Sequence, residues 1–232
     1  MSDGSMTTLG RGALPPGRRS PGVATGNRWL MHRATKPLLF VAALGPLAGL
    51  VYGIFTDTLG ANPAETLIRS TGDWTLRFLC LTLAVTPLRQ WTGWHALARL
   101  RRLLGLFTFF YGVLHFLCFA WLDMGFELDA IVRDIGKRPF ILVGTAALLL
   151  MLPLAATSFD RAVKALGATR WRALHRAVYA TALLALLHFF WMRAGKNDFA
   201  EVAVYAAVVA ALLGWRVWRR WRPARGRAPV SP

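Results

Sequence analysis

Residues 103–121 read LLGLFTFFYGVLHFLCFAW, and this stretch decides the fold class. It contains no Asp, Glu, Lys or Arg, and it carries one histidine, His115. A helix rises about 1.5 Å per residue, so the stretch reaches about 28 Å, close to the thickness of a bilayer's hydrocarbon core. We therefore expect residues 103–121 to cross a membrane as a helix.

Five further apolar runs extend this pattern to the whole chain. Hydrophobic residues make up 55% of the sequence, and period-2 alternation, which would indicate a membrane barrel, is absent. The second run is short and carries Arg77. The sequence predicts an all-α membrane protein, a six-helix transmembrane bundle, with these spans: Leu38–Phe55, Trp74–Leu88, Leu103–Trp121, Phe140–Ala156, Ala173–Met192 and Phe199–Trp215.

The basic residues alternate from one connection to the next. The N-terminal tail, the second and fourth loops and the C-terminal tail hold six, four, four and six Lys or Arg. The first, third and fifth loops hold one, three and two, and all acids but Asp3 and Asp160 lie in or beside them. The positive-inside rule then places both termini in the cytoplasm. This placement accounts for the formal charge of +17 without nucleic-acid binding, which would need one basic soluble face.

Composition divides the chain into three parts. Residues 1–36 are rich in Gly, Pro, Ser and Arg and are expected to be a disordered basic cytoplasmic tail. Residues 37–218 form the membrane domain, and residues 219–232 form a second basic tail. Cys80 and Cys118 both fall inside apolar runs, so we interpret them as small core residues rather than as a disulfide or a metal site.

Three of the five histidines fall inside the predicted spans, where an ionisable side chain usually faces a partner or a site. His115 lies in the third span, and His175 and His188 lie in the fifth. The third and fifth spans run in the same direction, and helix rise puts His115 and His188 at depths that differ by only about 5 Å. We therefore predict that His115 and His188 ligate one haem iron from opposite faces, an arrangement suited to electron transfer.

His175 lies thirteen residues before His188, about 20 Å away along a helix, at a depth that suits a second haem. The third span has no histidine at that depth, and fourteen residues before His115 stands Arg101. Arginine does not ligate iron, but Arg101 and its neighbour Arg102 are candidates to bind a haem propionate or a flavin phosphate. Arg77 in the second span is a third candidate for a propionate, with snorkelling to lipid phosphate as the alternative.

The order of several short motifs resembles a known family. They are TLGANPAE, TGDWTLRFL, LTLAVTPLR, RRLLGL, KRPFILVG, ALGATRWRALHRAVY and HFFW, together with the spacing of the three histidines, and they cover roughly residues 37–222. In this order they resemble the MsrQ (YedZ) family, haem-binding membrane subunits of the periplasmic methionine-sulfoxide reductase system, within the ferric-reductase-like transmembrane group. The long N-terminal tail is the main departure from the family.

The resemblance carries expectations beyond the residues. It implies a protein of the bacterial inner membrane that holds haem b and bound FMN, with His115, His175 and His188 as candidate haem ligands. It also implies a partner, a periplasmic molybdopterin enzyme that reduces methionine sulfoxide in oxidised proteins, and electrons from the quinone pool or a flavin reductase. The chain shows no flavin signature of its own, so FMN rests on the resemblance alone.

Two alternatives remain at this point. The chain could be the cytochrome b subunit of another respiratory enzyme, with the same chemistry and a different partner. It could also be a carrier with polar histidines, although neither broken helices nor internal repeats are evident. In the preferred interpretation the chain relays electrons and breaks no substrate bond itself.

Overall fold

The computed structural model describes residues 21–195 and 197–221, and every regular element within these ranges is a helix. The elements are α1 (Pro21–Met31), α2 (Thr35–Phe55), α3 (Pro63–Thr92), the 3-10 turn η1 (His95–Arg99), α4 (Arg101–Cys118), the π-helical turn η2 (Phe119–Asp123), α5 (Leu128–Lys137), α6 (Pro139–Ala156), α7 (Asp160–Leu174), α8 (Ala177–Ala194) and α9 (Ala200–Trp221).

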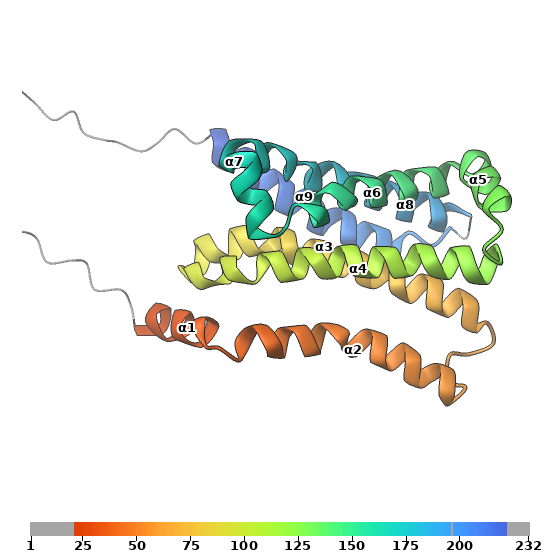
Figure 1. Cartoon of the computed structure of the whole chain (residues 1–232), viewed down its shortest axis with the longest axis horizontal. Coiled ribbons are helices and arrows are strands. Elements are labelled where there is room, and N and C mark those ends of the chain that lie inside the picture. Colours follow the sequence, from red (N-terminus) through yellow and green to blue (C-terminus); the bar gives the residue numbers. More distant parts are fainter. Residues whose placement is uncertain (1–20, 196, 222–232) are drawn as a thin grey trace, which may run out of the picture.

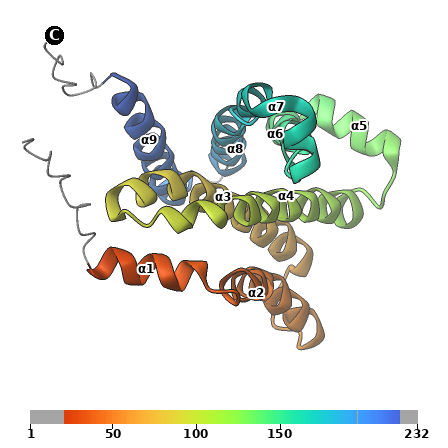
Figure 2. The same ribbon diagram turned by 60° about the vertical axis from the view of Figure 1, so that its left-hand side comes forward.

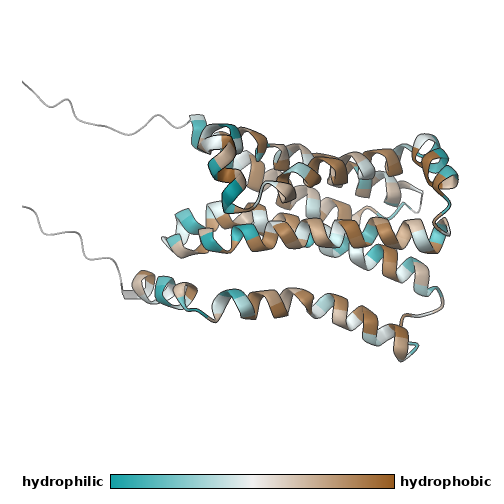
Figure 3. Cartoon of the chain, in the orientation of Figure 1, coloured by the Kyte–Doolittle hydropathy of each residue, from teal (hydrophilic) through white to brown (hydrophobic). Residues whose placement is uncertain are grey.

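The long helices lie side by side along one direction, with short helices at the two ends (Figure 1). The helix α5 lies across one end, and α7 packs at the other, where α1 begins and α9 finishes. Hydrophobic residues fill the middle of the long helices, whereas hydrophilic residues gather near the two ends (Figure 3). This distribution is what a bilayer imposes on a bundle that crosses it.

Five helical segments are long and apolar enough to span a membrane: Thr35–Phe55, His95–Asp123, Pro139–Ala156, Ala177–Ala194 and Ala200–Trp221. They overlap five of the expected spans. The remaining expected span, Trp74–Leu88, lies within α3, which is 30 residues long and carries Glu65, Arg69, Asp73, Arg77 and Arg89. The expectation followed the apolar run alone, whereas the helix starts eleven residues earlier, because Asn62 caps its first turn by accepting a hydrogen bond from the Glu65 amide.

The helix α3 is the centre of the bundle. One apolar core joins α3 to α8 and α9 through Leu76, Leu79, Leu83, Ala182, Phe189, Val202 and Val209. A second core joins α3 to α2 and α4 through Ala43, Phe78, Val85, Leu104, Phe107 and Tyr111. Figure 2 shows α3 and α4 between α2 on one side and α6, α8 and α9 on the other. Burial of both faces explains why α3 can be less apolar overall than a helix that faces lipid.

A tyrosine ties the peripheral helix α2 to this centre. Pro46 lies inside α2, where its ring disturbs the helical hydrogen bonds because proline has no amide hydrogen to donate. The fully buried hydroxyl of Tyr111 donates to the carbonyl of Ala43 at 2.8 Å and accepts from the amide of Leu47 at 3.1 Å. These two backbone groups would pair with each other in an uninterrupted helix, so Tyr111 satisfies polar groups beside the proline.

Two segments differ from the expectations. The helix α1 occupies residues that were expected to belong to a disordered tail, and Asn27 anchors it by donating to Gly93 O and accepting from Ala96 N in the turn after α3. Residues 1–20 and 222–232 of the expected tails lie outside the described residues. The fifth span, expected to begin at Ala173, begins at Ala177, so His175 lies in the turn between α7 and α8.

Candidate functional site

The structure brings His115 and His188 together. His115 lies near the end of α4, and His188 lies in α8, which runs in the same direction (Figure 1). Their ring centroids are 6.0 Å apart and the ring planes cross at 76°. Two metal–imidazole bonds of about 2 Å each place two ligating nitrogens about 4 Å apart, and the ring centres lie about 1 Å beyond each nitrogen. The observed separation therefore matches two imidazoles that ligate a single metal ion.

A backbone carbonyl fixes the orientation of each imidazole. His115 Nδ1 donates to the Ile68 carbonyl of α3 at 2.8 Å, and His188 Nδ1 donates to the Phe140 carbonyl of α6 at 2.6 Å. A carbonyl can only accept, so Nδ1 carries the hydrogen in both rings and Nε2 keeps its lone pair. Histidines that bind a metal through one ring nitrogen commonly donate a hydrogen bond from the other nitrogen in this way.

Both rings line a cavity of about 540 Å³ between α3, α4, α6 and α8, which we call the histidine cavity. Its volume lies within the range of small-molecule and cofactor sites. Glycines flank both imidazoles: a Cβ added at Gly72 would lie 3.0 Å from His115 Cε1, and one at Gly144 would lie 2.7 Å from His188 Nδ1. Two free Nε2 atoms, a cavity of cofactor size and glycines against both rings fit a bis-histidine haem.

Charged and polar residues line the histidine cavity at its α5 end, and we call them the rim. The rim residues are Asn62, Glu65, Arg69, Asp73, Asp123 and Arg138. Arg69 forms an ion pair with Glu65, and Arg138 forms one with Asp134 at 2.9 Å. In the sequence, Arg69 and Arg138 stand out only as loop charges, and nothing beside them in the chain marks them as cavity residues.

Arg77 does not line the histidine cavity. Its Nε donates to the Tyr205 hydroxyl of α9 at 3.2 Å, and its guanidinium lies 4.7 Å from the centre of the Trp74 ring. The structure therefore places Arg77 toward α9, and Arg69 and Arg138 are the arginines that a propionate in this cavity could reach.

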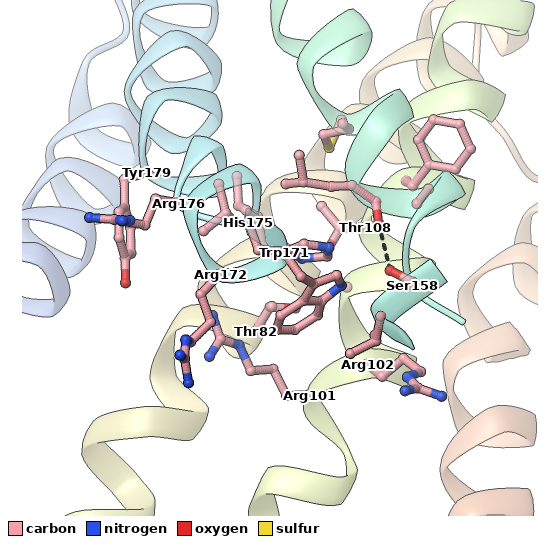
Figure 4. Close-up of a pocket in the computed structure, with 18 of the residues that line it drawn as sticks. Thr82, Arg101, Arg102, Thr108, Ser158, Trp171, Arg172, His175, Arg176 and Tyr179 are labelled. Carbon is pink, nitrogen blue, oxygen red and sulfur yellow. Dashed lines mark hydrogen bonds between the residues drawn. The ribbon is translucent and has the colours of Figure 1, made fainter. Parts of the chain in front are cut away.

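A second cavity, of about 900 Å³, lies at the α7 end, and we call it the arginine cavity. Arg101, Arg102 and His175 all line it, together with Lys164, Arg172, Arg176 and Arg220. Figure 4 shows the Trp171 ring beside His175, with the side chains of Arg101 and Arg172 below them. The excess of positive charge favours an anionic ligand.

The helix α7 closes one wall of the arginine cavity. It is kinked at Gly167, whose φ of 73° suits glycine, and its described side chains are not fully buried. The first residue of α7, Asp160, accepts a hydrogen bond from Arg102 at 2.5 Å. This hydrogen bond and the charge of Arg102 lower the pKa of the Asp160 carboxyl. Trp171 Nε1 donates to the Thr157 carbonyl at 2.9 Å at the other end.

His175 is held differently from the other two histidines. Its Nε2 lies 3.0 Å from the Thr157 hydroxyl, and its ring stacks on Trp171 with centroids 4.1 Å apart. Burial lowers the pKa of His175, and the nearby charge of Arg101 lowers it further. No second histidine lines the arginine cavity among the described residues. The structure thus supplies one possible axial ligand here, against two in the histidine cavity.

Comparisons with known proteins give the chain's relatives. Residues 71–187 match the family described as "Ferric reductase like transmembrane component". The "Protein-methionine-sulfoxide reductase heme-binding subunit MsrQ" of Polaromonas naphthalenivorans is 62% identical over 205 residues, covering 88% of this chain and 94% of that protein. Proteins with the same description in Ralstonia nicotianae and Herminiimonas arsenicoxydans are 56% and 52% identical, covering 83% and 81% of this chain and 89% and 86% of their own lengths. No solved structure matches the chain.

Proposed function

Since this chain belongs to the MsrQ family of haem-binding electron-transfer subunits in bacterial membranes, we propose that it passes electrons through haem b to a periplasmic methionine-sulfoxide reductase. The partner is a molybdopterin enzyme that repairs oxidised periplasmic proteins. The observation that carries the proposal is the pair His115 and His188, whose ring centroids lie 6.0 Å apart. Two histidine ligands leave iron no open position, which suits a relay rather than a catalyst of bond breaking.

The histidines and their supports define what the protein contributes. Ile68 O and Phe140 O keep each Nδ1–H engaged, so that Nε2 of both rings keeps its lone pair and would be the atom that binds the iron. Haem supplies one-electron chemistry when it is bound. Apolar side chains such as Leu76, Ile141 and Met192 line the cavity beside the rings, and Arg69 and Arg138 would offer positive charge at the rim to propionates.

We propose six crossings with both termini in the cytoplasm, α3 being the crossing that is screened from lipid. The start of α1 and the end of α9 lie at the same end of the bundle (Figure 1). That end holds the arginine cavity, whereas the α5 end holds Asp57, Glu127 and Asp129. Under the positive-inside rule the arginine cavity faces the cytoplasm, and the rim of the histidine cavity faces the periplasm.

The arginine cavity is our proposed site for FMN, a cofactor that the family resemblance leads us to expect. Arg101 and Arg102 line this cavity and would bind the phosphate, and the stacked pair Trp171 and His175 would offer an aromatic surface to a flat ring. A second haem would have His175 as its one histidine ligand among the described residues, which favours the flavin. Quinol or a flavin reductase delivers electrons on this side.

Reconstitution tests the function. The chain is placed in liposomes with the purified periplasmic reductase outside and a quinol or reduced flavin as donor, and reduction of methionine sulfoxide is followed. We expect turnover with the parent chain and none with His188→Ala, and the haem bands of the parent should reoxidise when the reductase and its substrate are added. Reoxidation that does not depend on the reductase would instead indicate another respiratory partner.

A further inference from the structure

The two ligand histidines belong to helix pairs of the same design. The helix α3 packs against α4, α6 packs against α8, and these are the two most extensive helix contacts in the described structure. In each pair, the first helix supplies a carbonyl to the Nδ1 atom of the histidine on the second helix. The acceptor and the histidine are 47 residues apart in one pair and 48 in the other.

The positions of the glycines repeat in the same way. Gly72 follows Ile68 by four residues, and Gly144 follows Phe140 by four residues. Each glycine therefore lies one helical turn after the carbonyl, on the same face of its helix. A Cβ at either position would meet the imidazole whose Nδ1 that carbonyl holds, at 3.0 Å for His115 and 2.7 Å for His188.

The second helices of the two pairs also share a sequence. Residues 114–116 read LHF, and residues 187–189 read LHF again. The helices α4 and α8 run in the same direction (Figure 1), which is the arrangement that an approximate two-fold axis along the helices would give. Membrane proteins built from parallel repeats have this kind of axis.

We propose that the haem site consists of two copies of one helix-pair unit, and that Gly72 and Gly144 are equivalent positioning residues, each fixing the imidazole of its own unit. The proposal rests on haem ligation by His115 and His188. In each unit the carbonyl orients the ring, and the absent Cβ leaves room for the Nδ1–Cε1 edge of the ring beside the first helix. Neither glycine touches the iron; each acts through its histidine.

Substituting each glycine with alanine tests the equivalence. An added methyl pushes the ring from its rotamer, and such strain changes an equilibrium by about two- to tenfold. We expect the fraction of reduced haem that binds carbon monoxide to rise by about that factor, more in Gly144→Ala than in Gly72→Ala, because its contact is shorter. Carbon monoxide reports the vacated axial position, which a loss of helix packing alone would not open.

Matched controls separate positioning from packing. Gly105→Ala alters the same helix as His115, and its Cβ would lie 3.7 Å from Thr82, an ordinary contact, so it should bind no more carbon monoxide than the parent. In a double-mutant cycle, Gly72→Ala should change nothing further once His115 is alanine. An additive loss of thermal stability in that cycle would show that Gly72 serves packing, and would overturn the proposal.

Two other outcomes are distinguishable. If His115→Ala and His188→Ala lose their axial ligand while both glycine variants match the parent spectrum, the positioning role is wrong and the haem site stands. If the histidine variants themselves keep a six-coordinate haem, the haem site proposed above is wrong, and this inference falls with it. A spectrum altered in only one glycine variant would contradict the equivalence of the two units.

Discussion

The histidine cavity and the arginine cavity occupy opposite ends of one bundle and hold their histidines by different means. His115 and His188 each donate to a backbone carbonyl, whereas His175 shares a hydrogen bond with the hydroxyl of Thr157. The carbonyls leave Nε2 of His115 and His188 with its lone pair. The Thr157 hydroxyl donates its only hydrogen to the Pro153 carbonyl at 2.7 Å, so it accepts from His175, whose Nε2 therefore carries the hydrogen. The role of a histidine in a membrane protein is therefore better assigned from the hydrogen bonds of its two ring nitrogens than from its depth.

The largest expected effect tests the two cavities against each other. His115→Ala and His188→Ala should each lower haem content by more than about tenfold, because even changes behind a metal ligand cost about 10–100-fold in affinity. His175→Ala should keep the reduced haem bands of the histidine cavity. Pyridine haemochrome assays of purified protein measure this, with His95→Ala in η1 as the control. Equal haem loss in His175→Ala would break the distinction between the cavities.

The positive charge of the arginine cavity should strengthen the binding of an anionic ligand there and leave the haem content unchanged. Arg101→Gln and Arg102→Gln should each weaken FMN binding by about tenfold, the value of one charge-assisted hydrogen bond of about 1.5 kcal/mol. Haem content should stay at the parent level. Fluorescence titration with FMN gives the affinity, and Arg99→Gln serves as the control because Arg99 contacts the Leu30 carbonyl instead. Unchanged FMN affinity in both variants would remove the flavin from this cavity.

Much of this contrast was predictable from the sequence, and the reasons for the rest are physical. The rise of a helix is fixed, so counting residues placed His115 and His188 at one level, and the structure brings their rings together. Backbone acceptors such as Ile68 O and Phe140 O leave no trace in side-chain identity, and they depend on which helices pair. His175 seemed to continue an apolar run, but its turn forms where α7 packs back on Thr157.

The arginines at the rim of the histidine cavity should tune its redox potential. A positive charge favours ferrous haem, so Arg69→Gln and Arg138→Gln should lower the midpoint potential. A unit charge about 10 Å from the iron, in an effective dielectric of about 20, shifts the midpoint potential by about 70 mV. The acids Glu65 and Asp134, which pair with these arginines, reduce the expected shift to a few tens of millivolts. Arg77→Gln, outside the cavity lining, should shift the potential less, and spectroelectrochemical titration would show a reversed order if Arg77 held a propionate.

The smallest effect concerns association at the α5 end. Asp123, Glu127 and Asp129 are exposed there, and Asp123 lines the rim of the histidine cavity. Neutralising all three should slow reduction of a partner with a basic surface by about two- to threefold at low salt, because rim charges act mainly on the association rate. Stopped-flow rates at several salt concentrations measure this, and Asp160→Asn at the opposite end is the control. A faster rate would indicate an acidic partner surface.

The hydrogen bonds of Tyr111 to Ala43 and Leu47 make the stable insertion of α2 depend on the later synthesis of α4. The tyrosine follows Leu47 by 64 residues, so α2 enters the membrane well before the hydroxyl that pairs with its backbone exists. Until then the carbonyl of Ala43 and the amide of Leu47, next to Pro46, lie in hydrocarbon with weakened pairing, which is costly. Nascent chains that end before α4 should therefore retain α2 in the bilayer less firmly than chains that include α4, so a later helix completes the insertion of an earlier one.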